Sequence, residues 1–359
     1  MGVRETEIKE LLKIVVDEDA SDLHLKADGA PCLRVHGELV KLDVDPLSPE
    51  SVRKLAYSIM PEKQKRDFEE KNEVDFAYTS ELGRFRVNAY RERGNTSMSF
   101  RLVKSEKLNI EELNLPEIIL KLADESRGLV LVTGTAGSGK STTLAAMINH
   151  INELRRAHVI TVEDPIEFIH LDKKSFISQR EIGIDTDSYY DALRNVVRQD
   201  PDVILIGEMR DLDTVRAALT AAEMGNLVLS TLHTIDATET INRIIDFFPP
   251  YQQRQIRIML ASTLKGIVSQ RLLSQIGGDL IPAVEVMLMT STIKEYILNE
   301  QETFKIRDAI EQGDYYGMQS FEQCLLKLYQ EEKITLDDAV AMSSNSEDFK
   351  IRIKQMGLA

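Results

Sequence analysis

A run of small residues followed by a lysine in the middle of the chain has the types and spacing of a phosphate-binding loop. The run consists of Gly134, Thr135, Ala136, Gly137, Ser138, Gly139, Lys140, Ser141 and Thr142, which contain the pattern Gly-x-x-x-x-Gly-Lys-Ser. The glycines let the backbone turn tightly and direct its N–H groups at phosphate oxygens. Lys140 would place a cation beside the β- and γ-phosphates, while the Ser141 hydroxyl would bind Mg²⁺. The loop therefore predicts a site for a nucleoside triphosphate with Mg²⁺.

The segments on either side of this loop have the patterns that a phosphate site needs. Residues 129–132 form a short apolar run, which is typical of a buried parallel strand. After the loop, apolar residues recur at helical spacing, namely Leu144, Met147, Ile148, Ile151 and Leu154. Such a helix would direct the positive end of its dipole at the same phosphates. The alternative is a glycine-rich turn that matches by chance, and the strand before it and the helix after it argue against that alternative.

Three other polar residues each follow a short apolar run that predicts a strand: Glu163, Glu208 and His233. In an open parallel sheet the ligand lies beyond the carboxyl ends of the strands, so these side chains are expected beside the nucleotide. ATP hydrolysis needs a carboxylate that activates water, an acid near Mg²⁺ and a group that senses the γ-phosphate. Each residue alone also has a structural explanation, because acidic pairs before proline often cap turns and single histidines are usually structural. Their occurrence together on one sheet favours a catalytic site.

Length and charge limit the classes of protein to which the chain can belong. Its 359 residues predict two domains or one large domain with an appendage. A net charge of −15 disfavours a nucleic-acid partner. The cysteines Cys32 and Cys324 are far apart and have no metal-site spacing, which indicates a reduced, cytosolic compartment. Residues 1–9 lack a secretory core, and no apolar run reaches the roughly 18–20 residues of a membrane span, so no direct span is expected.

Residues 1–104 are predicted to form a small α/β domain. Helices are expected over 4–16, 48–60 and 63–70, and strands over 20–25 and 31–40 with a turn at Gly37.

The clearest strand pair in this domain lies over residues 84–90 and 97–103, joined by a turn at Gly94-Asn95. Pairing about that turn places apolar residues on one face, namely Phe85, Val87, Ala89, Met98, Phe100 and Leu102. The other face carries Arg84, Arg86 and Arg101. The hairpin itself offers these arginines no acid-rich partner, so an anion such as triphosphate is the predicted partner. The alternative is that the arginines form an ordinary solvated basic face.

After a connector over residues 105–115, residues 116–289 alternate strands with helices, which predicts a doubly wound, mostly parallel sheet. Strands are expected over 158–162, 203–206, 227–230 and 280–288, and helices over 188–197, 213–223, 237–245 and 252–269. Residues 290–359 are predicted to be a helical C-terminal region. One helix there is marked by Phe321, Leu325 and Tyr329, and another, over 334–342, has Thr335 as its expected N-cap.

With these motifs in this order, the chain resembles the type II/IV secretion ATPases of the RecA-like superfamily, and within them the PilT-type retraction motors of type IV pili. The resemblance rests on residues 134–141 as Walker A, 160–167 as the aspartate box, 199–211 as Walker B and 230–236 as the histidine box. Residues 21–25, 84–88 and 266–272 are also similar to this family. The resemblance covers almost the whole chain.

The resemblance implies roles for individual residues. Glu163 would be the catalytic base, Glu208 would act on Mg²⁺, through water, and His233 would contact the γ-phosphate. Arg86 and Arg101 would be arginines that a PAS-like N-terminal domain offers to the nucleotide. The family implies a homo-hexameric ring in the bacterial cytoplasm, at the inner face of the cytoplasmic membrane. There it docks on an inner-membrane pilus platform protein, and a second retraction ATPase is a further expected partner.

The chain departs from the family pattern in two places. Residues 135–136 are Thr-Ala where the family usually has Pro-Thr. Either pair would direct its backbone at the phosphates, so no loss of nucleotide binding is expected. Residues 291–297 keep the apolar spacing of the family's C-terminal retraction segment but not its sequence. The direction of motion and the choice between PilT and PilU types therefore stay open in the sequence.

Three alternatives compete with a retraction motor. An extension or secretion ATPase of the same family usually has a longer N-terminal region and often a four-cysteine zinc insert, and neither is in this sequence. A RecA-like nucleic-acid translocase is disfavoured by the acidic balance and by the lack of interleaved aromatic and basic residues. A regulatory subunit without turnover is disfavoured because Lys140, Ser141, Glu163 and Glu208 are all intact.

Overall fold

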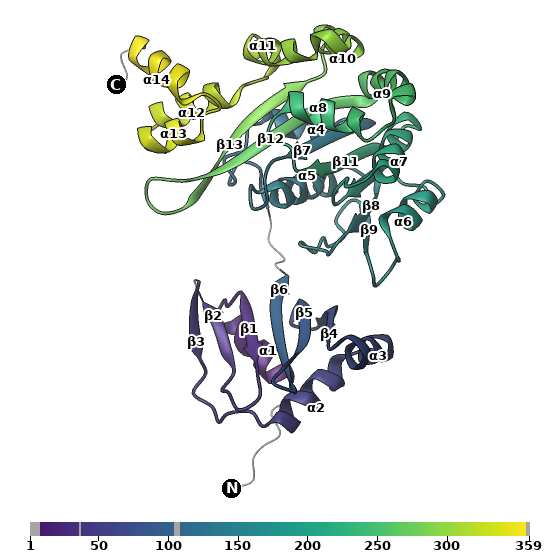
Figure 1. The fold of residues 1–359 in the computed structure, drawn as a ribbon, viewed down its shortest axis with the longest axis vertical. Helices are drawn as coiled ribbons and strands as arrows, with labels where there is room; N and C mark the ends of the chain where they lie inside the picture. Colours follow the sequence, from purple (N-terminus) through teal and green to yellow (C-terminus); the bar gives the residue numbers. More distant parts are fainter. Residues whose placement is uncertain (1–7, 36, 104–107, 357–359) are drawn as a thin grey trace. The chain divides into compact units, whose positions relative to one another are not determined.

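The computed structural model describes residues 8–35, 37–103 and 108–356, which form two compact units. One unit is N-terminal and the other holds the phosphate-loop sequence (Figure 1). Residues 4–7 of the predicted first helix and residues 105–107 of the predicted connector lie outside the described residues.

The N-terminal unit is a six-stranded antiparallel sheet packed against helices (Figure 1). The strand order is β3-β2-β1-β6-β5-β4. The strands are β1 (Asp22–Leu25), β2 (Cys32–Val35), β3 (Glu38–Lys41), β4 (Glu73–Ser80), β5 (Gly83–Glu92) and β6 (Asn95–Val103). The helices are α1 (Ile8–Asp17), α2 (Pro49–Ile59) and α3 (Glu62–Lys71). Their apolar sides share one hydrophobic core with Phe85, Val87 and Phe100, because alternation along β5 and β6 directs these side chains to the same face.

The β5–β6 hairpin has the predicted faces but a different turn. Its two turn residues are Arg93 and Gly94, both with positive φ, and Asn95 already pairs with Glu92 as the first residue of β6. Two residues with positive φ match the twist of a two-residue hairpin, so the predicted turn at Gly94-Asn95 is wrong by one residue. Strand β4 was not predicted, although Val74, Phe76 and Tyr78 alternate with other residues along it; most of its side chains are half-buried or exposed.

The second unit is built on a seven-stranded sheet in the order β13-β12-β7-β11-β10-β8-β9. All neighbouring strands are parallel except β12 and β13, so the predicted α/β class with a mostly parallel sheet is confirmed. The strands are β7 (Gly128–Thr133), β8 (His158–Glu163), β9 (Phe176–Glu181), β10 (Val203–Ile206), β11 (Leu227–Leu232), β12 (Leu264–Ser274) and β13 (Leu280–Leu288).

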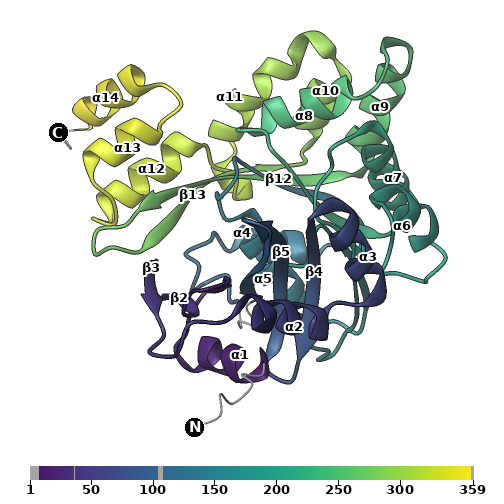
Figure 2. The same ribbon diagram turned by 60° about the horizontal axis from the view of Figure 1, so that its bottom comes forward.

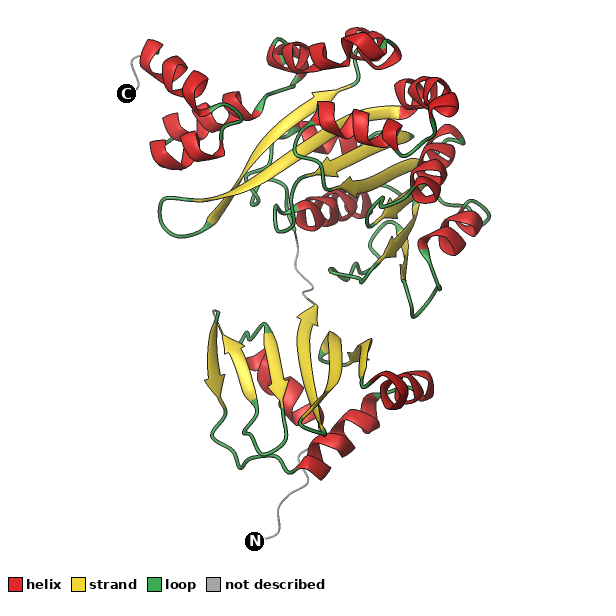
Figure 3. Ribbon diagram, in the orientation of Figure 1, coloured by secondary structure: helices red, strands yellow, loops and turns green. Residues whose placement is uncertain are grey.

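Helices cover both faces of this sheet (Figure 3). On one side α4 (Ile118–Ala123) packs against α5 (Lys140–Leu154), and on the other α7 (Leu212–Glu223) packs against α6 (Tyr189–Val196) and α9 (Pro250–Thr263). Helix α8 (Ala237–Asp246) packs against α9 and against the β12–β13 pair. The central strands are buried on both faces, which explains their continuous apolar sequences.

The largest error in the predicted elements concerns residues 252–269. The helix ends at Thr263, and residues from Leu264 onward form β12, which pairs with both β7 and β13. At Gly266 a Cβ would lie 2.9 Å from the carbonyl oxygen of Met287, so this position lies close to the neighbouring strand. Long-range pairing therefore overrides the local helical spacing. Strand β9 was also missed, because its side chains are mostly half-buried and polar.

The C-terminal region is helical, as predicted. It contains α10 (Ser291–Leu298), η1 (Glu300–Lys305), α11 (Ile306–Glu311), η2 (Asp314–Tyr316), α12 (Phe321–Gln330), α13 (Leu336–Met342) and α14 (Ser346–Gln355). Helices α12–α14 gather at the far end of the β12–β13 pair (Figure 1, Figure 2), where Leu273 and Ile281 share a core with Phe321. Thr335 caps α13 as predicted, since its side chain accepts a hydrogen bond from the Asp338 amide. Among the described helices, none combines the length and apolarity that crossing a bilayer would require.

Candidate nucleotide site at the carboxyl edge of the parallel sheet

The phosphate loop connects the end of β7 to the first residue of α5. Gly134, Gly137 and Gly139 all have positive φ, which L side chains rarely adopt. At Gly134 a Cβ would also lie 2.4 Å from both the carbonyl oxygen of Gln270 and the Ser138 Oγ. The loop thus needs glycine at Gly134 for space as well as for conformation.

Lys140 lies over this loop. Its ammonium donates hydrogen bonds to the carbonyl oxygens of Gly134 and Thr135, both at 2.8 Å. It is the first residue of α5, a helix of 15 residues whose N-terminal amides point toward the loop. Ser138 Oγ is buried and has no hydrogen-bond partner among the described residues. A lysine, helix amides and an unpaired hydroxyl around one loop fit the oxygens of a phosphate group.

Glu163 is the last residue of β8, and two neighbours orient its carboxylate. Its Oε1 accepts hydrogen bonds from Thr161 Oγ1 at 2.7 Å and from Gln179 Nε2 at 3.2 Å. Gln179 belongs to β9, the strand that the sequence did not reveal. Nothing in the sequence signals that this glutamine contacts Glu163, because the contact depends on the pairing of β8 with β9.

The structure brings Glu208 and His233 together. Glu208 follows β10 and His233 follows β11, the strand paired with it. Glu208 Oε2 lies 3.4 Å from His233 Nε2, and the carboxylate also forms an ion pair with Arg210. The Glu208 side chain is only 14% exposed, and its hydrogen bond raises the pKa of Arg210. Arg210 was missed as a site residue although it lies within the Walker B segment.

Tyr189 is a second missed residue near these acids. It is the first residue of α6, and its hydroxyl lies 2.9 Å from the position that a Cβ on Gly207 would occupy. Burial raises the pKa of Tyr189, and the negative charges of Asp164 and Glu208 act in the same direction. The phenol is therefore neutral at ordinary pH and can donate a hydrogen bond. Gly207 leaves room for that hydroxyl between β8 and β10.

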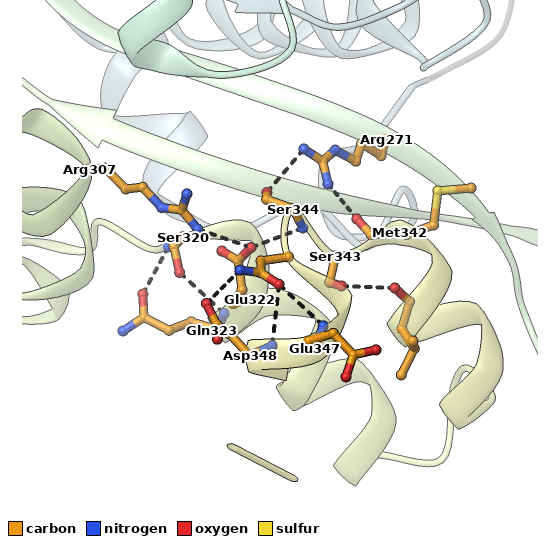
Figure 4. A network of polar contacts seen from close by, with 12 residues as sticks. Arg271, Arg307, Ser320, Glu322, Gln323, Met342, Ser343, Ser344, Glu347 and Asp348 are labelled. Atoms are coloured by element: carbon orange, nitrogen blue, oxygen red, sulfur yellow. Dashed lines mark hydrogen bonds and ion pairs between the residues drawn. The ribbon is translucent and has the colours of Figure 1, made fainter. Parts of the chain in front are cut away.

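A pocket of ≈ 290 Å³ adjoins the phosphate loop. Residues 134–138 line one side of it, and the rest is lined by Ile235, Gln270, Arg271, Leu272 and Met342. Gln270 also exchanges hydrogen bonds with Thr143 on α5, at 2.8 and 3.1 Å. Arg271 donates to the carbonyl oxygen of Met342 and to Ser344 Oγ (Figure 4). The sequence did not predict any contribution from β12 or α13 at this site.

Arg86 and Arg101 lie in the N-terminal unit, directly opposite each other on β5 and β6. The predicted shared face of the arginines is confirmed, but one of them has an acid partner from outside the hairpin. Arg101 Nε donates to Asp22 Oδ1 on β1 at 2.8 Å. Asp22 has a side chain only 5% exposed, whereas that of Arg101 is 64% exposed. Arg86 has no ion-pair partner among the described residues of its own unit.

Comparison with known proteins gives consistent matches over nearly the full chain. The sequence profile of the type II/IV secretion system protein family matches residues 2–280. The type IV pilus retraction ATPase PilT of Pseudomonas aeruginosa is 43% identical over 344 residues, covering 96% of this chain and 100% of that protein. The type IV pilus ATPase PilU of the same organism is 40% identical, covering 97% of this chain and 91% of that protein.

A solved structure gives the same result in three dimensions. The crystal structure of the pilus retraction motor PilT with bound ADP superposes with a TM-score of 0.90 at 44% identity. The match covers 96% of this chain and 99% of the other. The second unit therefore has the RecA-like ATPase fold that the sequence predicted.

Proposed function

The chain belongs to the type II/IV secretion system protein family, and on this basis we propose that it is a motor ATPase that drives type IV pilus retraction. The observation that carries ATP hydrolysis is the phosphate loop together with Glu163 at the end of β8 and Glu208 and His233 just after β10 and β11, while the match to PilT supports retraction. Neighbouring parallel strands place these groups at one edge of one sheet.

In the proposed reaction, Lys140 and the loop amides bind the β- and γ-phosphates of ATP. Mg²⁺, when bound, supplies positive charge against the phosphate oxygens. The Ser141 hydroxyl would hold it directly and Glu208 through water. Glu163, fixed by Thr161 and Gln179, would orient and deprotonate the attacking water.

The remaining groups respond to the transferred phosphoryl group. His233 would contact the γ-phosphate. Its Nε2 lies 3.4 Å from Glu208 Oε2, so the residue proposed to contact the γ-phosphate is next to the residue proposed to act on Mg²⁺. Arg86 and Arg101 would neutralise charge that develops on the phosphoryl oxygens, as guanidinium groups do when another domain or subunit supplies them.

We further propose a homo-hexameric ring in which nucleotide is bound between units. The ring would work in the cytoplasm on an inner-membrane pilus platform protein, where a second retraction ATPase is a further proposed partner. The close structural match to the pilus retraction motor PilT supports this assignment.

The test combines turnover, mass and pilus length. The purified chain should hydrolyse ATP with Mg²⁺, DNA should not stimulate it, and light scattering with an ATP analogue should give the mass of a hexamer. Deleting the gene should produce cells with excess pili, and a Lys140→Ala copy should fail to restore retraction. Bald cells would contradict retraction, and DNA-stimulated turnover would indicate a translocase.

A further inference from the structure

The pocket beside the phosphate loop has a wall from the C-terminal helices. Met342, the last residue of α13, lines it together with loop residues 134–138. More than 200 positions separate these two segments in the sequence, by the difference between positions 342 and 138. The C-terminal region therefore lies beside the phosphate loop, at a pocket that a nucleotide bound to the loop could enter.

Arg271 holds this wall in place. Its guanidinium donates to the Met342 carbonyl oxygen and, at 3.3 Å, to Ser344 Oγ (Figure 4). The guanidinium carbon also lies 3.8 Å from the centre of the Phe321 ring. These contacts join β12 to two segments of the C-terminal region. A planar guanidinium suits the task because it can bind two acceptors while stacking on an aromatic ring.

The α13–α14 junction, residues 342–345, is itself well fixed. Glu322 on α12 accepts a hydrogen bond from the Ser344 amide at 3.0 Å and pairs with Arg307 at 3.4 Å (Figure 4). Asn345 caps α14 by accepting from the amides of Glu347 and Asp348. The junction is therefore positioned by the side chains of Arg271, Glu322 and Asn345. A displacement of Met342 would shift both α13 and α14.

The residue next to Arg271 on β12 contacts the phosphate loop and the helix that follows it. Gln270, next to Arg271 on β12, hydrogen-bonds Thr143 on α5, and its carbonyl oxygen lies against Gly134. Side chains alternate along a strand, so Gln270 contacts α5 while Arg271 contacts the α13–α14 junction. Residues 270–271 thus contact both the phosphate loop and the C-terminal helices.

We propose that the α13–α14 junction is part of the nucleotide site, and that Arg271 couples nucleotide binding to the packing of the C-terminal helices. The inference rests on the proposed function, since it assumes that a nucleotide occupies the phosphate loop. Coupling of this kind is reciprocal: if nucleotide stabilises the junction, then loosening the junction weakens nucleotide binding by the same factor. Typical coupling factors are about 5–150-fold, and a single arginine should give a value near the low end.

The experiment measures hydrogen exchange over residues 336–355 in the full chain, with and without ADP and Mg²⁺, alongside the affinity for a fluorescent ADP analogue. In the wild type, ADP should slow exchange in this segment. Arg271→Lys keeps the charge but loses the two-pronged contact, so it should abolish the ADP-dependent slowing and weaken ADP binding about fivefold. Arg352→Ala, an exposed site on α14, is the matched control and should behave as the wild type.

The outcomes separate the inference from the proposed function. If ADP binds the wild-type chain and exchange over residues 336–355 is unchanged, the inference is wrong while the nucleotide site stands. If Arg271→Lys binds ADP as the wild type does and retains the slowing, Arg271 is not the coupling residue and the inference is equally overturned. If the wild type binds no ADP, the proposed function fails and the inference fails with it.

Discussion

The two units bring their charged groups together in different ways. In the second unit, β7, β11, β10 and β8 are parallel neighbours, so the groups at their ends meet wherever the sheet forms. In the N-terminal unit, Arg86 and Arg101 meet each other across an antiparallel pair, and no strand of the same sheet brings a phosphate site to them. The first set is positioned by topology alone, whereas the second set has no phosphate loop within its own unit.

Pairing differs between the two units as well. Glu208 has both Arg210 and His233 beside it within its own unit. Arg101 has Asp22, and removing Arg101 would leave this buried carboxylate without its cation, although the Ser21 hydroxyl would still donate to it, and the loss costs stability. Arg86 is the cleaner probe of the N-terminal unit, because its loss leaves no buried acid without a partner.

The largest effect is expected at the phosphate loop. Lys140→Ala should abolish ATP turnover, because in the proposed reaction its buried ammonium binds the phosphates. Phosphate release measures the loss, and circular dichroism checks that the fold is kept. Lys121→Ala, an exposed lysine on α4, is the control. Turnover near the wild-type rate in Lys140→Ala would show that the loop is not the reacting site.

The two acids should give different, smaller effects. Glu163→Gln should bind ATP with Mg²⁺ yet lose about 10²–10⁴-fold in turnover, since it removes only the carboxylate that would activate water in the proposed reaction. Glu208→Gln should also weaken Mg²⁺-dependent binding. Binding of a fluorescent ATP analogue with and without Mg²⁺ separates the two variants. If Glu208→Gln traps ATP and Glu163→Gln does not, the two roles are reversed.

The smallest effect concerns a buried acid outside the reacting groups. Burial raises the pKa of Glu285 on β13 to about 7 from an ordinary 4.5, with Asp236 and Glu322 adding to the rise, while the Ala237 amide and Arg271 oppose it. Because the folded-state pKa is raised, Glu285 favours folding below about pH 4.5, and this contribution is lost as pH rises toward 7. The loss is at most about 3 kcal/mol.

Glu285→Gln removes that titration. Its melting temperature relative to the wild type should therefore be higher at pH 8 than at pH 5. The exposed Glu112→Gln should show the same difference from the wild type at both values. An equal difference at both values for Glu285→Gln would mean that the buried carboxyl does not titrate in this range.

Much of the secondary structure of the second unit could be predicted because short stretches of the sequence determine it. The apolar runs of β7, β10 and β11 are bounded by glycine or polar residues, and the strand β13 was predicted with its bounds. Most of the wrong or missing elements lie where pairing with a neighbouring strand determines the secondary structure. The edge strand β9 is mostly polar and has no strong alternation, and β12 is a strand only because β7 and β13 lie on either side of it. The edge strand β4 does alternate, through Val74, Phe76 and Tyr78, and its omission from the predicted strands was an error.

The same division holds for the site. The phosphate loop and the acids that follow strands were predictable, because motif spacing and sheet topology suffice to place them. Gln179, Tyr189 and Arg271 could not be found, since each contacts a residue on another element and the contact depends on how the elements pack. Asp22 was missed as the partner of Arg101 for the same reason: β1 lies next to β6 in the sheet but far from it in the chain.

In the proposed motor, the N-terminal unit supplies an arginine to a reaction carried out at the sheet edge of the second unit. The sharpest test of this division of labour is steady-state turnover of Arg86→Ala, with affinity for a fluorescent ATP analogue measured on the same sample. Arg66→Ala, an exposed arginine on α3, is the control. Arg86→Ala should bind nucleotide as the wild type does and lose about 10³–10⁵-fold in turnover, while Arg66→Ala keeps both. Wild-type turnover in Arg86→Ala would contradict this role and leave the arginine face as ordinary surface.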